Sequence, residues 1–178
     1  MKTISEEIFC AGFGGQGIMF MGKLLTEAGL IADQNVTWMP AYGAEVRGGT
    51  SYSMVKISNV EIASPIVISP DILVVMNKPS LLKYESSVKP GGILISNKSL
   101  VGDFNKPKGI KVVNIHMTEI ASKLGDIRCA NMIAVGAIAK HSATISIRNV
   151  IAALKSAFKG KDELFLLNKS AIEKGYGT

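Results

Sequence analysis

The residues most able to do chemistry stand in two glycine-rich segments near the N-terminus. The first, residues 12–17, reads Gly-Phe-Gly-Gly-Gln-Gly. It directly follows a short apolar run and directly precedes a helical pattern, which is the context of a phosphate-binding G-x-G-x-x-G turn. There the first glycine permits the tight turn, the second lets a ligand approach the backbone, and the third permits contact between helix and strand. The N–H groups and positive dipole end of the following helix favour an anion.

The residues that follow restrict the kind of ligand. A nicotinamide or flavin dinucleotide site needs an acid near the end of the second strand, where it holds the ribose hydroxyls. The second predicted strand, residues 35–39, ends at Pro40 without an acid, and Asp33 lies before it. The first segment also lacks the Lys-Ser or Lys-Thr of a triphosphate-binding loop. A dinucleotide is disfavoured, and two interpretations stay open: phosphate binding, or a tight loop that serves only packing or a subunit contact.

The second segment, residues 42–51, reads Tyr-Gly-Ala-Glu-Val-Arg-Gly-Gly-Thr-Ser. It follows the second strand, so we expect it at the same edge of the sheet as the first segment. Arg47 carries the planar group that grips a phosphate or carboxylate through two hydrogen bonds. The alternative is a surface ion pair between Arg47 and Glu45, which contributes little to stability. Three glycines around a charged pair favour a shaped binding loop.

Alternating strand and helix patterns must position these loops. Strands are predicted at residues 8–11, 35–39, 51–57, 60–62, 71–76, 91–96 and 111–115, and helices at 17–32, 79–86, 118–124, 131–140, after Ser146 and at 161–174. The strand at 60–62 is expected to pair with 51–57 across a Ser58-Asn59 turn. Gly22 and Gly29 on one face of the first helix predict close approach to a sheet. The pattern predicts an α/β fold with a doubly wound, mostly parallel sheet, helices on both faces and an added antiparallel hairpin.

Composition excludes several classes of function. The formal net charge of +6 is spread along the chain and few aromatic residues accompany it, which disfavours nucleic acid. No apolar run has the length of a membrane span, and the acidic N-terminus predicts a cytoplasmic protein. Charged residues make up only 19% of the chain, and the helix at 131–140 is rich in small residues. Both features suggest a large subunit contact.

Isolated cysteines and histidines give no sign of a metal centre. Cys10 and Cys129 are too few for an iron–sulfur cluster held by four cysteines and are expected to be buried free thiols. His116 and His141 have no metal-ligand motif around them. No thiamine-type Gly-Asp-Gly motif is present either, so the sequence shows no complete active site.

The two glycine-rich segments carry a family resemblance. Together with Ile-Ala-Ser-Pro at 62–65, Lys-Pro-Gly-Gly at 89–92 and Ala-Asn-Met at 130–132, they make the chain similar to the gamma subunit of 2-oxoacid:ferredoxin oxidoreductases. The resemblance covers nearly the whole chain. It therefore predicts a single gamma-subunit domain over residues 1–178. The Tyr-Gly-x-Glu-x-Arg-Gly-Gly form looks more like the 2-oxoglutarate and branched-chain members than the pyruvate members. Ala44 departs from the proline that is frequent there.

The resemblance implies a division of labour. Such enzymes convert a 2-oxoacid and coenzyme A to an acyl-CoA and carbon dioxide and pass two electrons to ferredoxin. Thiamine diphosphate and the iron–sulfur clusters are expected on the alpha, beta and ferredoxin-like delta subunits, while the gamma chain supplies subunit contacts and part of the coenzyme A site. The residues carried over to that site are Gly12, Gly14, Gly15, Gln16, Gly17, Tyr42, Glu45, Arg47, Gly48 and Asn131. Asn131 is also open to a second role, as the cap of its helix.

Two other hypotheses stay open. In the first, the chain is a stand-alone nucleotide-binding module, such as a NAD-linked reductase. In the second, it is a structural subunit whose glycine loops only shape an interface.

Overall fold

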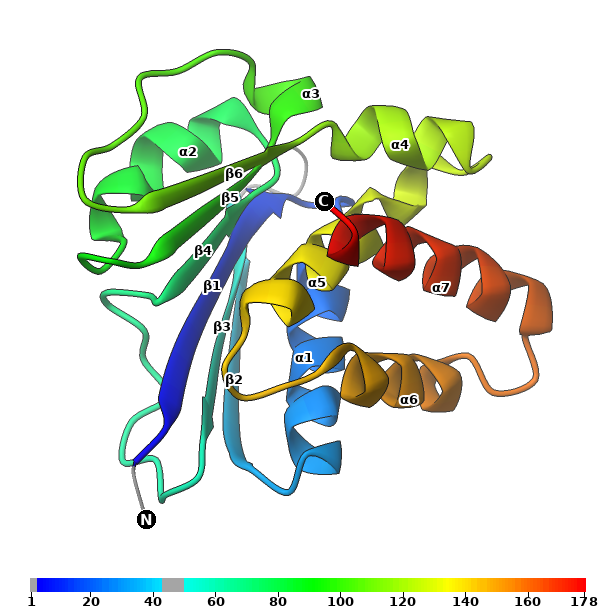
Figure 1. Ribbon diagram of the computed structural model, residues 1–178, viewed down its shortest axis with the longest axis horizontal. Helices are drawn as coiled ribbons and strands as arrows, with labels where there is room; N and C mark the ends of the chain where they lie inside the picture. Colours follow the sequence, from blue (N-terminus) through cyan, green and yellow to red (C-terminus); the bar gives the residue numbers. More distant parts are fainter. Residues whose placement is uncertain (1–2, 43–49) are drawn as a thin grey trace.

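A mixed sheet forms the centre of the protein (Figure 1). The computed structural model describes residues 3–42 and 50–178. Within this part the strand order is β2-β3-β1-β4-β5-β6. The strands are β1 (Ser5–Phe13), β2 (Asn35–Tyr42), β3 (Thr50–Ser58), β4 (Ile72–Val75), β5 (Ile93–Asn97) and β6 (Lys111–Ile115). β3 runs antiparallel to both of its neighbours, and the pairs from β1 through β6 are parallel. The predicted mostly parallel α/β sheet with an antiparallel part is confirmed.

Helices cover both faces of this sheet. The helices are α1 (Ile18–Ile31), α2 (Lys78–Tyr84), α3 (Lys98–Val101), α4 (Met117–Lys123), α5 (Ala130–His141), α6 (Ile147–Ala157) and α7 (Asp162–Tyr176), with 3₁₀ turns η1 (Glu85–Ser87) and η2 (Ile127–Cys129). One apolar core joins α1, α5, α6 and α7 to one face of the sheet, and a second joins α2 and α3 to the other face. Figure 1 shows α2 and α1 on opposite sides of the strands.

The predicted hairpin is wrong in its partner strand. β3 pairs with β2, not with residues 60–62, which form no strand. A two-residue hairpin turn needs positive φ angles, and neither Ser58 nor Asn59 has one. Instead the Asn59 N–H donates to the carbonyl of Ile4, and the chain leaves the sheet there. β2 also continues past Pro40 to Tyr42, because an edge strand tolerates a residue without an N–H on its open side.

The two glycines in α1 bring that helix onto the sheet, as predicted. A Cβ on Gly22 would overlap the Ser53 hydroxyl, and a Cβ on Gly29 would lie 2.6 Å from the Val36 side chain. The Trp38 indole N–H donates to the same Ser53 hydroxyl at 2.8 Å. Small residues on one helix face thus let α1 pack directly over β2 and β3, which fixes the start of α1 beside the end of β1.

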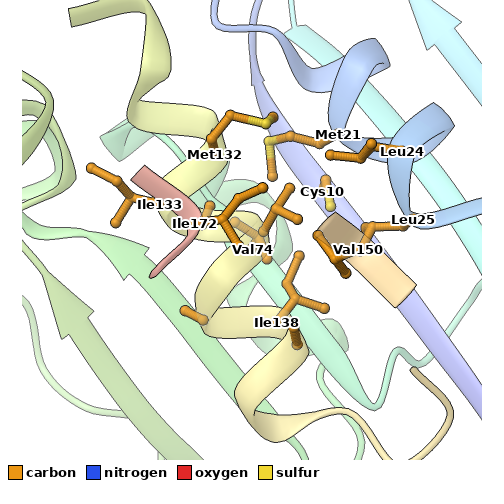
Figure 2. Close-up of a cluster of buried hydrophobic side chains, with 14 of the residues drawn as sticks. Cys10, Met21, Leu24, Leu25, Val74, Met132, Ile133, Ile138, Val150 and Ile172 are labelled. Atoms are coloured by element: carbon orange, nitrogen blue, oxygen red, sulfur yellow. The ribbon is translucent and has the colours of Figure 1, made fainter. Parts of the chain in front are cut away.

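The helix of small residues, α5, is covered by the chain itself. Its residues from Ala130 to Ala139 are buried, several of them in the core shown in Figure 2. A Cβ on Gly136 would overlap the Ile172 carbonyl of α7, and one on Gly175 would overlap the Ile133 carbonyl of α5. The small residues of this helix serve the close crossing of α5 and α7, so they are no sign of a subunit contact, and the expected contact stays a prediction.

A buried carboxylate ties the start of β1 to the turn after α5. Glu6 accepts hydrogen bonds from the hydroxyls of Ser142 and Thr144 and from the Ala143 N–H. Three donors on one carboxylate compensate its removal from water. This contact fixes the strand that leads into the first glycine segment.

The predicted buried thiols are confirmed, since Cys10 and Cys129 are both buried and free. None of the helices in the described ranges is long and apolar enough to cross a membrane.

Candidate functional site

A cavity of about 220 Å³ lies at the carboxyl ends of β1, β4 and β5. Ligands of open α/β sheets bind at this edge, in the crevice where the helices switch from one face of the sheet to the other. Here α1 follows β1 on one face and α2 follows β4 on the opposite face. The cavity is lined by Gly15, Gln16, Met76, Asn97, Leu100, Thr118, Ile127, Arg128, Ala130 and Asn131. Three residues that the sequence singled out, Gly15, Gln16 and Asn131, therefore line the same cavity.

Gln16 closes the crevice between β1 and β4. Its Oε1 accepts from the Phe13 N–H and from Asn77 Nδ2, both at 2.8 Å. Its Nε2 donates to the Met76 carbonyl at 3.3 Å. Asn77 in turn caps α2, with its Oδ1 accepting from the Ser80 N–H at 2.9 Å. Because both ends of the Gln16 carboxamide are engaged within the chain, Gln16 shapes the cavity wall and holds the loop to β4.

Different structural constraints require glycine at different positions of residues 12–17. A Cβ on Gly12 would lie 2.7 Å from the Gln16 Oε1, and Gly17 has φ +71° with Asn131 against its missing side chain. Gly15 has φ +96°, and a Cβ placed on Gly14 would meet no described atom within 4 Å. Packing therefore explains Gly12 and Gly17, and backbone geometry explains Gly15. Gly14 has neither constraint within the described chain, so its surroundings leave room for a group from outside.

Asn131 connects α5 to the start of α1. Its side chain is only 6% exposed, and its Nδ2 donates to the Gly17 carbonyl at 3.3 Å. The N-cap of α5 is Cys129, so the alternative role of Asn131 as the helix cap is wrong. Two helices of 14 and 12 residues, α1 and α5, thus begin at the same cavity. Their N–H groups and positive dipole ends make this wall favourable for an anion.

Arg128 is a member of the cavity that sequence reasoning missed. Its Nη2 donates to Asp126 Oδ2 at 2.7 Å, and its Nε lies 3.0 Å from both carboxylate oxygens. The side chain of Arg128 is 82% exposed, whereas that of Asp126 is 20% exposed. These hydrogen bonds lower the pKa of the Asp126 carboxyl below its ordinary value, so the pair stays ionised. The guanidinium is held in one orientation with its outer N–H groups left for an anion.

The sequence around Arg128 contains a short pattern, but this pattern describes only the local turn. Asp126 and Arg128 stand two residues apart directly before a helix, and Asp126 caps η2 by accepting from the Arg128 N–H. Only the tertiary fold brings this turn beside residues 15–17.

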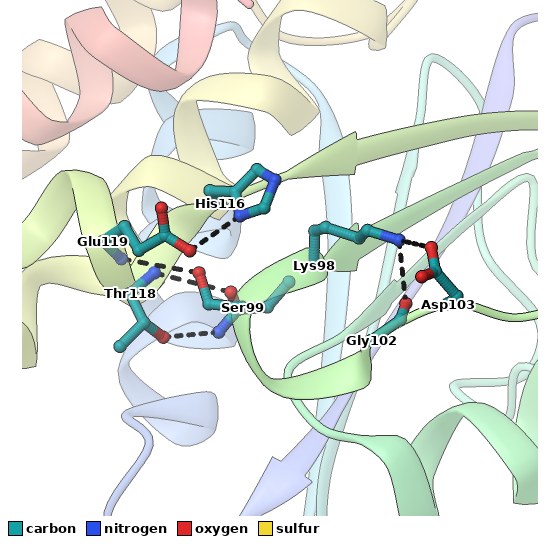
Figure 3. A network of polar contacts seen from close by, with 8 residues as sticks. Lys98, Ser99, Gly102, Asp103, His116, Thr118 and Glu119 are labelled. Atoms are coloured by element: carbon teal, nitrogen blue, oxygen red, sulfur yellow. Dashed lines mark hydrogen bonds and ion pairs between the residues drawn. The ribbon is translucent and has the colours of Figure 1, made fainter.

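Polar contacts stiffen the far wall of the cavity. Asn97, fully buried at the end of β5, donates through Nδ2 to the Thr118 hydroxyl at 2.9 Å and accepts from the Thr118 N–H at 3.4 Å. Figure 3 shows Thr118 beside the pair of His116 and Glu119, whose Nδ1 and Oε1 are 2.8 Å apart. The end of β5 is therefore tied to the start of α4 at this wall of the cavity.

The second glycine segment lies mostly outside the described residues. Glu45, Arg47 and Gly48 are among residues 43–49, so their predicted roles stay predictions. Tyr42 is the last residue of β2, and its backbone pairs with Ser51. Since Thr50 pairs with Phe13, both ends of the segment start from the edge of the sheet that carries residues 12–17.

Within residues 3–42 and 50–178, no group of three or more His, Cys, Asp or Glu side chains is placed to hold a metal ion. Burial raises the pKa of the Cys10 thiol to about 12, so it stays protonated and unreactive.

Comparison with known proteins gives one consistent group. The family model described as pyruvate ferredoxin/flavodoxin oxidoreductase matches residues 7–178. The 2-oxoglutarate synthase subunit KorC of Methanocaldococcus jannaschii is 36% identical over 177 residues, which are 96% of this chain and 92% of KorC. The ketoisovalerate oxidoreductase subunit VorA of Methanothermobacter marburgensis is 36% identical over 93% of this chain. The chain spans only about a third of VorA, 34% of its length.

Solved structures show the same fold. The gamma subunit of a keto/oxoacid ferredoxin oxidoreductase from Geobacter sulfurreducens aligns with a TM-score of 0.83 and 28% identity, over 97% of this chain and 96% of that chain. A 2-oxoglutarate:ferredoxin oxidoreductase from Magnetococcus marinus, with 2-oxoglutarate, coenzyme A and succinyl-CoA bound, aligns with a TM-score of 0.88 and 26% identity. That alignment covers 99% of this chain and 31% of the other.

Proposed function

Because the chain belongs to the pyruvate ferredoxin/flavodoxin oxidoreductase family, we propose that it is the gamma subunit of a 2-oxoacid:ferredoxin oxidoreductase, which forms an acyl-CoA and carbon dioxide. We propose 2-oxoglutarate as the 2-oxoacid, since KorC matches this chain over nearly the full length of both proteins. The partners in this proposal are alpha, beta and ferredoxin-like delta subunits. Thiamine diphosphate bound to a partner would supply the decarboxylation chemistry, and partner iron–sulfur clusters would accept the electrons.

We further propose that the cavity at the carboxyl ends of β1, β4 and β5 receives a phosphate group of coenzyme A. The observation that carries this proposal is the meeting of the starts of α1 and α5 with the Arg128 guanidinium at one cavity. Helix N-termini and a fixed guanidinium both stabilise a phosphate. In this role the chain binds and orients coenzyme A, and its own residues carry out no bond-breaking step.

A dinucleotide is less well supported, for a reason of topology. β3 lies between β1 and β2. At about 4.8 Å between neighbouring strands, the end of β2 is about 10 Å from the end of β1. This order places the end of β2 one strand farther from the loop of residues 12–17 than in the dinucleotide-binding fold, where the second strand is the direct neighbour of the first.

A structural role without ligand binding explains Gly12 and Gly17, and it explains Arg128 only through the ion pair with Asp126. The side chain of Arg128 is held by Asp126, is 82% exposed and lines the cavity.

The test has two parts. Calorimetric titration of the full chain with coenzyme A and with NAD should show binding of coenzyme A only. Reconstitution with the partner chains should then give acyl-CoA formation that disappears when this chain is left out. Unchanged acyl-CoA formation without this chain would exclude the subunit role, and binding of NAD alone would favour the stand-alone module.

A further inference from the structure

One edge of the central sheet is open at β6. The strand order ends there, and among the described residues β6 pairs with β5 alone (Figure 1). The Lys111 N–H donates to the carbonyl of Gly92, the residue before β5. Because backbone groups point to alternate sides along a strand, those of Val112 and Asn114 point away from β5. They form a row of donors and acceptors that can pair with a further strand.

The chain beside this edge is basic. Residues 98–116 contain four lysines and one acid, Asp103, and that acid pairs with the lysine at the start of α3. Lys106, Lys108 and Lys111 are exposed, and none of them forms an ion pair with an acidic side chain of the described chain. Three positive charges without an acidic partner therefore stand at the start of the open strand and just before it.

The end of α5 extends this basic region. Burial lowers the pKa of His141, and the charges of Lys111 and Lys140 lower it further. These three residues therefore lie close enough for their charges to act on one another. Glu6 is bound to the turn that follows α5, but it is only 5% exposed and accepts hydrogen bonds from three donors. An anion at the start of β6 thus meets positive charge from both β6 and α5.

These charges restrict what can pair with the edge. Lysines on an edge strand repel a second copy of the same edge and so prevent self-pairing. Nucleic acid would need aromatic side chains to stack on, and the only aromatic residue in 104–115 is Phe104, which packs on the second core. A strand with carboxylate side chains meets neither obstacle. Strand addition takes its affinity from main-chain hydrogen bonds and its specificity from alternate side chains.

We propose that β6 is a docking strand for an acidic, extended segment of a partner polypeptide. The main chain of the segment pairs with Val112 and Asn114, and its carboxylates lie beside Lys106, Lys108 and Lys111. The inference rests on the fold and its charges and goes beyond the coenzyme A role. The basic region begins at the start of β6, whereas the proposed coenzyme A cavity lies at the carboxyl ends of β1, β4 and β5.

The test uses three peptides, blocked at both ends, and the full chain. The acidic probe is Glu-Val-Glu-Val-Glu-Val-Glu. The second peptide has glutamine in place of each glutamate and lacks the charge. The third is the acidic probe with a methyl group on every backbone nitrogen, so it keeps the charge and has no main-chain donor. Calorimetry should show binding of the acidic probe, and about tenfold weaker binding or none for the other two.

Two kinds of variant locate the site. Combined Lys106→Glu, Lys108→Glu and Lys111→Glu should weaken binding of the acidic probe about tenfold, because attraction becomes repulsion at three positions. Val112→Pro should weaken it too, since it removes an outward donor, and an edge strand tolerates a proline whose nitrogen faces away from its partner. The matched control reverses three exposed lysines on other elements and should bind the acidic probe as the wild type does; its substitutions are Lys155→Glu, Lys159→Glu and Lys174→Glu.

Amide hydrogen exchange identifies the edge directly. Bound acidic probe should slow exchange at Val112 and Asn114 and leave β2, the other edge of the sheet, unchanged. Slower exchange at β2 alone would overturn the proposal.

The proposal is also wrong if the acidic probe binds the charge-reversed β6 variant as tightly as the wild type, or if the methylated peptide binds as tightly as the acidic probe. Binding of an oligothymidylate but not of the acidic probe would assign the edge to nucleic acid. A dimer in sedimentation, with slow exchange at Val112 before any peptide is added, would assign it to a second copy of the chain.

Discussion

Replacing Gly17 by alanine should weaken the junction between the glycine loop and α5. Gly17 has φ +71°, a left-handed conformation that costs an L-residue about 1–2 kcal/mol. The new Cβ would also overlap Asn131 Nδ2, so the Asn131 carboxamide would have to leave its hydrogen bond to the Gly17 carbonyl. Losing that bond costs about 0.5–1.5 kcal/mol. We therefore expect the free energy of unfolding to fall by about 1.5–3.5 kcal/mol, the sum of the two terms.

The assay is equilibrium unfolding in urea with a double-mutant cycle. In an Asn131→Ala background the overlap is gone, so Gly17→Ala should cost only the conformational part, and the coupling between the two substitutions should be about 1 kcal/mol. The Gly17 carbonyl keeps a partner in that background, since it also accepts from the Met21 N–H. Gly14→Ala is the control, because Gly14 has no positive φ and open space around its Cβ position. Its unfolding free energy should stay within about 0.5 kcal/mol of the wild type.

Strict additivity of the Gly17 and Asn131 substitutions would refute the proposed contact. Equal losses of unfolding free energy for Gly17→Ala and Gly14→Ala would refute the assignment of different constraints to the two glycines.

Three further outcomes follow from the described contacts. Gly136→Ala should destabilise the chain by about 3 kcal/mol or more in urea unfolding, because its Cβ meets the backbone carbonyl of Ile172, which cannot rotate away. Glu6→Gln should cost about 1–3 kcal/mol, since an amide N–H₂ would face the hydrogen-bond donors around it, whereas Glu7→Gln should cost less than about 1 kcal/mol at its partly exposed pair. Burial and two neighbouring lysines lower the pKa of His141, so its contribution to stability is full above the unfolded-state pKa and is lost as pH falls from there through the lower native value. Unfolding between pH 7.5 and 5 should therefore depend less on pH in His141→Asn, and an unchanged slope would contradict this.

Much of the fold followed from local pattern. The helix after residue 17, the strand at 111–115 and the capping role of Ser146 were all predicted, and each depends on short-range periodicity or on a side chain next to its own helix. The hairpin was wrong because strand pairing is not local. β3 pairs with a strand that precedes it and with β1, from which α1 and β2 separate it in sequence, and no turn signal encodes either partner.

The site was predictable only in part, for the same physical reason. The loop of residues 12–17 combines a strand end, a turn and a helix start in one run, so its place at the sheet edge could be inferred. Arg128 and Asn97 reach the cavity from separate crossovers of the sheet. Their neighbours in sequence, the pair of Asp126 and Arg128 included, resemble ordinary helix starts, so the local pattern did not assign them to the cavity.

Gly14 offers the strongest link between this chain and the complex in which we propose it works. Packing within the chain requires glycine at Gly12 and Gly17, whereas no contact in the described part requires glycine at Gly14. Leu100 and Ile127 line the cavity and are 48% and 58% exposed, so the cavity lies beside apolar surface that the described chain does not cover. We propose that this exposed loop and the apolar lining beside it are covered in the assembled enzyme. A ligand or a partner subunit would occupy that space, as the proposed gamma-subunit role requires.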